Sequence, residues 1–135
     1  MIGTRITRCY PAGNARLPQE IGERGLVLSQ FWPDATGSRQ TFPLRHAVMS
    51  GYGRASVVIE ARETSGARIQ AWLAVEHGRP VILTTSVVDG TSWGAALARR
   101  PGVWVARTAA GVMDSVRQVL DVDRQTEELL AVAQG

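Results

Sequence analysis

Lysine is absent from this 135-residue sequence, and cysteine occurs once, as Cys9. A single cysteine can form neither an internal disulfide nor a cysteine-rich zinc site, and its scarcity agrees with a reducing compartment. Uninterrupted apolar runs reach only about five residues, as in 71–75, whereas a membrane-spanning helix needs roughly 20. The start of the chain also lacks the basic, apolar and small-residue order of a secretory signal. These absences predict a cytoplasmic protein with no membrane segment, no metal and no other cofactor.

All fifteen basic residues are arginine, and they exceed the twelve acidic residues by three. The planar guanidinium group suits phosphate, so this composition favours an anionic partner. The excess is modest, however, and a preference for arginine also follows from a GC-rich genome. Charge alone therefore does not decide the function.

Short apolar runs alternate with helix-length segments, a pattern that favours parallel strands joined by crossover helices. We therefore expect a single α/β domain over residues 1–135, with a C-terminal helical segment at 111–135. The expected strands are 1–6 (a stub), 26–29, 55–61, 80–84 and 103–106. The expected helices are 14–24, 43–52, 66–77, 92–99, 111–120 and 123–133, and residues 30–41 form a long loop.

The first candidate site follows the expected strand 55–61 and consists of Thr64, Ser65, Gly66 and Ala67. The first amides of a helix favour phosphate or carboxylate, and glycine permits a close approach of the ligand. Serine with glycine is equally the ordinary cap of a crossover helix, and residue types alone favour that structural interpretation. Glu60 is either a base or ribose contact, because ligands gather at the carboxyl ends of such strands, or a cap for the loop.

The second candidate site combines Arg39 and Arg45 with the aromatic ring of Phe42. Arginine interleaved with an aromatic residue is typical of single-stranded nucleic acid binding, where the ring stacks on a base and the cations follow the phosphates. The alternative is that Phe42 packs the helix entry and the arginines are solvated. Residue types leave these two interpretations even.

Catalysis has no comparable support in the sequence. His46 and His77 lack a matched nucleophile with a third orienting group, and Cys9 lacks a neighbouring base. Most of the four tryptophans are expected to pack in the interior, Trp72 and Trp104 in particular. We therefore expect a binding protein and not an enzyme.

Taken in order, seven short motifs resemble the DNA-processing protein A (DprA, or Smf) family over residues 3–120. They are Gly3-Thr4, Tyr10-Pro11-Ala12-Gly13-Asn14, Gly25-Leu26-Val27-Leu28-Ser29, Phe42-Pro43-Leu44-Arg45, Val57-Val58-Ile59-Glu60-Ala61, Ser65-Gly66-Ala67 and Gly78-Arg79-Pro80-Val81. The resemblance implies a Rossmann-like, three-layer α/β/α fold with a mostly parallel sheet. It also implies single-stranded DNA binding without turnover, and loading of a RecA-like recombinase during natural transformation. By position, Phe42 corresponds to the base-stacking ring, Arg45 and Arg39 to DNA contacts, and residues 64–67 to the phosphate-binding turn.

The sequence departs from the family pattern at several positions. His46 and Ala47 stand where the family has Asn-Arg, Ala67 replaces a serine, and Gln70 replaces a threonine. The N-terminal half of the family's domain, with its own Gly-Ser-Arg turn, has no counterpart here. Loss of those central strands would expose a sheet edge. We therefore expect a homodimer, a partner chain that completes the sheet, or re-pairing of the stub 1–6.

Two other functions stay open at this stage. One is a nucleotide-binding or nucleotide-cleaving domain like the lysine-decarboxylase-like phosphoribohydrolases, with Glu60 as the acid or ribose contact; the glycine-rich motif of those enzymes is absent here. The other is an interaction scaffold that has lost its ligand. Release of a free base from a nucleoside monophosphate would distinguish the first from DNA binding.

Overall fold

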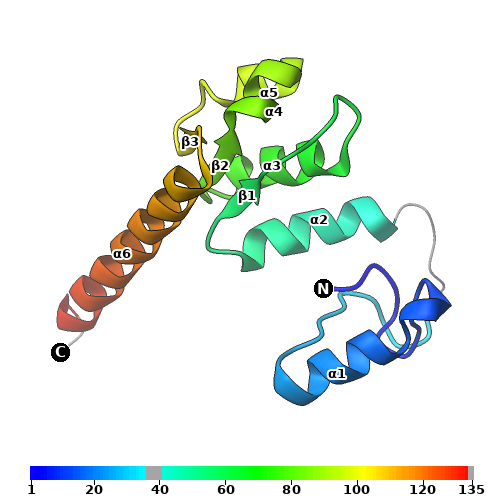
Figure 1. The fold of residues 1–135 in the computed structure, drawn as a ribbon. Helices are drawn as coiled ribbons and strands as arrows, with labels where there is room; N and C mark the ends of the chain where they lie inside the picture. Colours follow the sequence, from blue (N-terminus) through cyan, green and yellow to red (C-terminus); the bar gives the residue numbers. More distant parts are fainter. Residues whose placement is uncertain (36–40, 134–135) are drawn as a thin grey trace. The chain divides into compact units, whose positions relative to one another are not determined.

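A computed structural model describes residues 1–35 and 41–133, which divide into two compact units, Met1–Met49 and Ser50–Gly135. In the first unit, η1 (Ala12–Asn14) leads into α1 (Arg16–Arg24), which ends before Gly25, and most of α2 (Thr41–Tyr52) follows (Figure 1). Leu17 and Ile21 lie one turn apart on α1, and both are about half exposed, at 52% and 43%. The first unit therefore takes its shape more from turns and short hydrogen bonds than from a buried core.

The expected strands 1–6 and 26–29 are not formed. The two segments instead meet through a backbone hydrogen bond from Ile2 N to Leu28 O of 2.9 Å. The hydroxyl of Ser29 adds a second link by donating to the carbonyl oxygen of Thr4 at 2.7 Å. A short strand pair without a third strand is marginal, and this explains why one backbone bond forms here in place of a ladder.

The second unit contains a parallel sheet with the order β1-β2-β3, formed by β1 (Ser56–Val58), β2 (Val81–Thr84) and β3 (Val103–Ala106). Val57 pairs with Ile82, and Ile82 with Trp104. The crossovers are α3 (Gly66–Glu76) between β1 and β2, and the short helices α4 (Thr85–Gly90) and α5 (Ser92–Leu97) between β2 and β3. This confirms the expected α/β fold with parallel strands.

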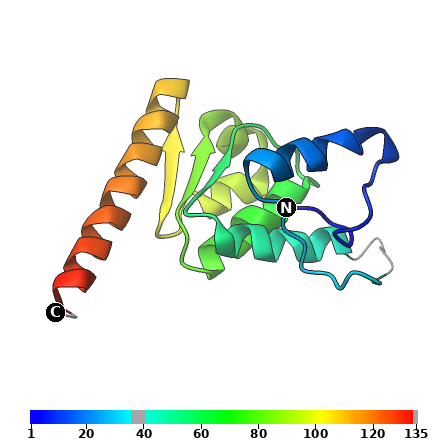
Figure 2. The same ribbon diagram turned by 90° about the horizontal axis from the view of Figure 1, so that it is seen from below.

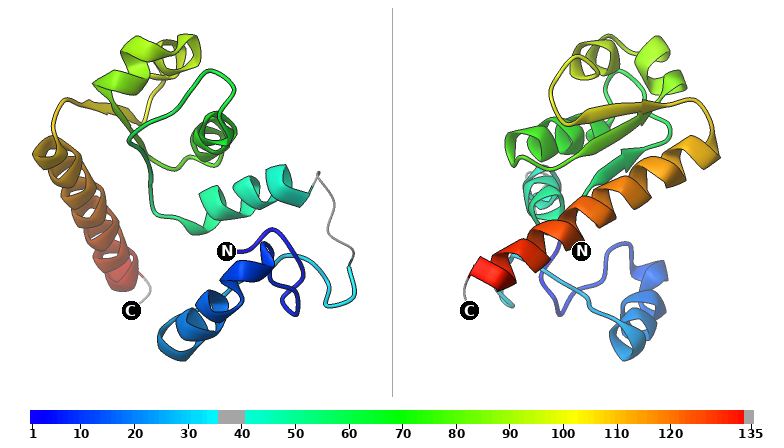
Figure 3. Two further views of the ribbon diagram at one scale, coloured as in Figure 1. Left: turned by 45° about the vertical axis from the view of Figure 1, so that its right-hand side comes forward. Right: turned by 90° about the vertical axis from the view of Figure 1, so that its left-hand side faces the viewer.

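The central strand of the sheet, β2, is covered on both faces, as is usual in a parallel sheet. Alternate residues of β2 point to opposite faces, so Val81 and Leu83 pack with Ala71 and Ala74 of α3, while Ile82 packs on the other face. That second face is covered by α6 (Ala109–Ala133) through Val112. Figure 3 shows α3 and α6 on the two sides of the strands.

The structure corrects two helix predictions in the second unit. The expected helices 111–120 and 123–133 form one continuous helix, α6, supported across the expected break by an ion pair between Arg124 and Asp121 of 3.1 Å. Figure 2 shows α6 running along β3 and continuing past it. The short helix α4 was not expected, because β-branched Val87 and Val88 are weak helix formers. Burial of Val87, which is 1% exposed, explains why α4 forms nonetheless.

The expected strand 55–61 is also shorter than its apolar run. Its ladder stops at Val58 because the next carbonyl, that of Ile59, accepts hydrogen bonds from two side chains of the following crossover. The donors are Thr84 Oγ1 at 2.6 Å and Ser86 Oγ at 3.3 Å. The chain therefore leaves the sheet at residue 59 and begins the loop that carries the first candidate site.

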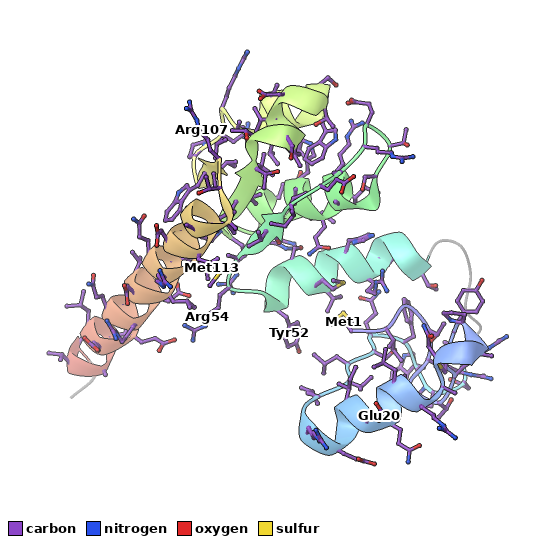
Figure 4. The ribbon with its side chains drawn as sticks, in the orientation of Figure 1. Met1, Glu20, Tyr52, Arg54, Arg107 and Met113 are labelled. Carbon is purple, nitrogen blue, oxygen red and sulfur yellow. The ribbon has the colours of Figure 1, made fainter. Side chains whose placement is uncertain are left out.

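Within the described ranges, no helix combines the length and apolarity that crossing a membrane requires. The distal part of α6 is tied to its own unit by Arg54, which contacts Asp123 at 3.4 Å and Glu127 at 2.9 Å. Figure 4 shows Arg54 beside α6. An exposed ion pair of this kind stabilises a fold by no more than about 1 kcal/mol.

Candidate functional site

The loop between β1 and α3 lies at the carboxyl end of the sheet and is held at three points. The first is the Ile59 carbonyl, described above. The second is the carbonyl of Arg62, which accepts a hydrogen bond of 3.3 Å from Trp93 Nε1. The third is the Glu63 carboxylate, which accepts from both the backbone amide and the hydroxyl of Ser92. The acceptors of the loop are thus turned toward the starts of α4 and α5.

Hydrogen bonds from Ser92 hold the pKa of Glu63 below its usual value. The side-chain bond has the larger effect and the backbone bond follows, while the positive charge of Arg68 lowers the pKa further. Since Ser92 is the first residue of α5, the carboxylate also faces the positive end of that helix. The negative charge of Glu63 is therefore compensated within the protein.

Ser65 is the N-cap of α3. Its hydroxyl oxygen accepts a hydrogen bond of 3.2 Å from the amide of Ala67, and the amide of Arg68 bonds to the Ser65 carbonyl at 3.1 Å. This is the capping arrangement that residue types favoured, and it satisfies two of the first amides of the helix. An anion at this turn would meet the exposed Gly66 and the hydroxyl of Thr64, which is also exposed.

An open surface pocket brings several predicted residues together. It is lined by Glu60, Ala61, Arg62, Thr64 and Ser65. Arg62 was not assigned to the site from the sequence, although it stands between two assigned residues and places a cation in the same pocket. At the end of β3, Arg107 follows the strand directly (Figure 4). Ligands of such sheets bind at the carboxyl ends of the strands, so the positions of Arg62 and Arg107 after β1 and β3 could have marked them as candidate anion contacts.

The second candidate site belongs to the first unit. Arg39 lies outside the described residues, and for Phe42 the structure describes the backbone alone, in the first turn of α2. Arg45 follows on the same helix, three residues after Phe42, and is partly buried. Residues three apart on a helix are neighbours on its surface, so Phe42 and Arg45 share one face of α2. Their roles in binding stay predictions.

The excess positive charge of the chain lies in this first unit. Residues 1–49 contain six arginines and three acidic residues, whereas residues 50–135 contain nine of each. The unit that carries Arg45 therefore has a net charge of +3, and the unit that carries the sheet is formally neutral. Electrostatic attraction of a polyanion would act mainly on the first unit.

One serine and histidine pair was not anticipated. Ser50 Oγ lies 3.0 Å from His77 Nδ1 and joins the end of α2 to the C-cap of α3. Ser50 is only 1% exposed, so a substrate cannot reach its hydroxyl. We interpret the pair as a structural link. Among the described residues, no group of three histidine, cysteine or acidic side chains is placed to hold a metal ion.

Comparisons with known proteins agree on one family. The family model described as DNA recombination-mediator protein A matches residues 1–121. DNA processing protein DprA of Streptococcus pneumoniae is 38% identical over 95 residues, which cover 70% of this chain and 34% of that protein. Protein Smf of Synechocystis is 37% identical over 81 residues, which cover 60% of this chain and 20% of that protein.

A solved structure agrees with the sequence comparisons. The X-ray structure of DNA processing protein A from Streptococcus pneumoniae matches with a TM-score of 0.67 and 33% identity, over 84% of this chain and 40% of that one. The chain therefore spans less than half the length of each of these proteins. The matched part includes the α/β fold, which supports the fold expected from the sequence.

Proposed function

The chain belongs to the DNA recombination-mediator protein A family, and on that premise we propose that it binds single-stranded DNA without catalysing a reaction. The observation that supports the proposal is the net charge of +3 in the first unit, which also contains Phe42 and Arg45 three residues apart on α2. In this role Phe42 stacks on a base, and Arg45 and Arg39 contact phosphates.

The turn at residues 64–67 supplies a second phosphate contact in this proposal. Its fixed loop supports the role, because the carboxylate of Glu63 is bonded to Ser92 and so turned away from an incoming anion. Within residues 64–67, the hydroxyl of Thr64 and the exposed backbone of Gly66 would meet the phosphate, because the amide of Ala67 is already bonded to Ser65. Arg62 lines the same pocket as Thr64 and Ser65. Glu60 lines the same pocket and would contact a ribose hydroxyl only if the ligand were a small nucleotide, because the sugars within a DNA strand carry no free hydroxyl.

We also propose the partners that family membership suggests. These are a RecA-like recombinase, for DNA processing during uptake, and either a second copy or another chain that pairs with the edge of the sheet. Support for the last point comes from β1, which in the described part of its unit pairs with β2 alone. The proposed setting is the cytoplasm, where such DNA would be handled.

The test is fluorescence anisotropy of a labelled poly-dT oligonucleotide titrated at several salt concentrations. We expect affinity to fall steeply with salt, because phosphate contacts release counterions. Phe42→Ala should cost about 1–3 kcal/mol of binding free energy through lost stacking. Arg45→Ala should weaken binding and reduce the salt slope by about 0.7, the value for one phosphate contact on a single strand.

A matched control is Arg117→Ala, which removes the same charge from an exposed ion pair with Asp114 on α6. This variant should bind like the unaltered chain. Absence of binding at low salt by a folded sample would refute DNA binding and direct the search to a small nucleotide. Unchanged affinity of a folded Phe42→Ala variant would refute the stacking role alone.

A further inference from the structure

Trp32 differs from the other tryptophans in the chain because its side chain is 79% exposed. Trp93 is buried at 3% exposure, and Trp72 and Trp104 are partly buried against the two core clusters. Tryptophan is on average highly buried, and its large ring makes exposure costly. The sequence interpretation that most tryptophans pack in the interior therefore does not account for Trp32.

The ring is carried by a turn whose three successive carbonyls each accept a hydrogen bond. A turn closes through the hydrogen bond from Ala35 N to Trp32 O at 3.0 Å. The neighbouring carbonyl of Pro33 accepts a bond of 3.2 Å from the hydroxyl of Thr7, and that of Asp34 accepts a bond of 3.5 Å from Arg5. A ring presented from a fixed turn loses little conformational entropy when a flat ligand stacks on it.

The N-terminal segment whose side chains hold this turn also carries two arginines, Arg5 and Arg8. Arg5 reaches the carbonyl of Asp34, while its Nε is buried without an acceptor among the described residues. Arg8 is exposed and closes a turn with Arg5 through a backbone bond of 3.0 Å. An exposed indole beside a segment with two permanent cations is the combination that holds the bases and phosphates of single-stranded nucleic acid.

We propose that Trp32 is a second base-stacking platform for single-stranded DNA, with Arg5 and Arg8 contacting the adjacent phosphates. The inference rests on the proposed function but uses different residues from those of α2. The arginines of the first unit would then form two groups of phosphate contacts, one with Phe42 and one with Trp32. A DNA strand bound at both groups would find an aromatic ring at each.

The experiment uses the same poly-dT titration with Trp32→Ala, Trp32→Phe and Arg8→Ala. Trp32→Ala should weaken binding roughly 5- to 100-fold, the effect of losing one stacked base, and leave the salt slope unchanged. Trp32→Phe should recover most of the affinity, because it retains an aromatic face. Arg8→Ala should lower the salt slope by about 0.7.

Intrinsic fluorescence gives an independent signal. DNA should quench the tryptophan emission of the unaltered chain, and the Trp32→Phe change should remove most of that quenching. Trp104→Phe is the matched control, since it removes one partly buried indole from the sheet and should leave the quenching in place.

The outcomes separate this inference from the proposed function. If the folded chain binds no DNA at low salt, both fail. If Phe42→Ala weakens binding but Trp32→Ala does not, the proposed function stands and the Trp32 platform is refuted. If Trp32→Ala lowers the melting temperature while affinity and quenching are unchanged, the ring belongs to a packing surface and the inference is again overturned.

Discussion

Single residues determine which groups of the β1 to α3 loop face outward. Sequence patterns predicted the Ser65 cap in its structural form, because serine before glycine at a helix start is a local signal. They could not predict that Trp93 reaches the carbonyl of Arg62 or that Ser92 binds Glu63, because these partners are 31 and 29 residues apart. Such contacts depend on tertiary packing, which residue types do not encode locally.

Glu63 should contribute stability in a pH-dependent way. Its pKa is lowered in the folded state, chiefly by the hydrogen bonds from Ser92, so its contribution is present near neutral pH and is lost as pH falls through that lowered value. We expect Glu63→Gln to lower the melting temperature at pH 7 and to approach the unaltered chain in acid. Thermal unfolding followed by circular dichroism across this range measures the difference.

The control for this prediction is Glu76→Gln, which changes an exposed glutamate in the last residue of α3. It should not reproduce the convergence in acid. A constant difference between Glu63→Gln and the unaltered chain at every pH would show that the charge of Glu63 is not involved.

Between elements, α5 approaches α4 closely at Gly94. Its amide donates to Thr91 Oγ1 at 3.0 Å, and the same hydroxyl donates to the carbonyl of Val87 at 2.8 Å. A Cβ at position 94 would lie 2.5 Å from that carbonyl oxygen. A short helix was predictable at 92–99 and forms over Ser92–Leu97, but its contact with α4 was not predictable, because α4 gave no helix signal in the sequence.

Gly94→Ala should therefore destabilise the fold, although alanine is the better helix former. We expect a loss of about 1–3 kcal/mol in the free energy of unfolding, as for overpacked sites, measured by urea denaturation. Gly90→Ala is the matched control, since no atom lies within 4 Å of its added Cβ, and it should be neutral or slightly stabilising. Equal stability of the two variants would contradict a fixed contact between α4 and α5.

For the molecule as a whole, β1 has the composition of a central strand but pairs with β2 alone among the described residues of its unit. Val58 is buried on the α3 side, while Val57 and Ile59 remain 41% and 58% exposed. A parallel strand is normally covered on both faces, and an open strand edge offers unpaired backbone groups to another chain. The alternation of apolar runs predicted the parallel sheet, but it could not determine what pairs with this edge, since that partner is not encoded in the strand itself.

We expect the chain to associate through this edge, with itself or with a chain that supplies a neighbouring strand. Multi-angle light scattering at micromolar concentration should give a mass above 14.6 kDa for the isolated protein if the partner is a second copy. Ile59→Lys places a charge on the exposed apolar side and should shift the mass toward the monomer, because charged residues at an edge oppose pairing. Arg117→Glu, a charge change on α6, should leave the mass unchanged. A monomer at every concentration would exclude self-association, and the edge would then require a different chain; if the unaltered protein and Ile59→Lys gave the same oligomer, another surface would mediate the contact.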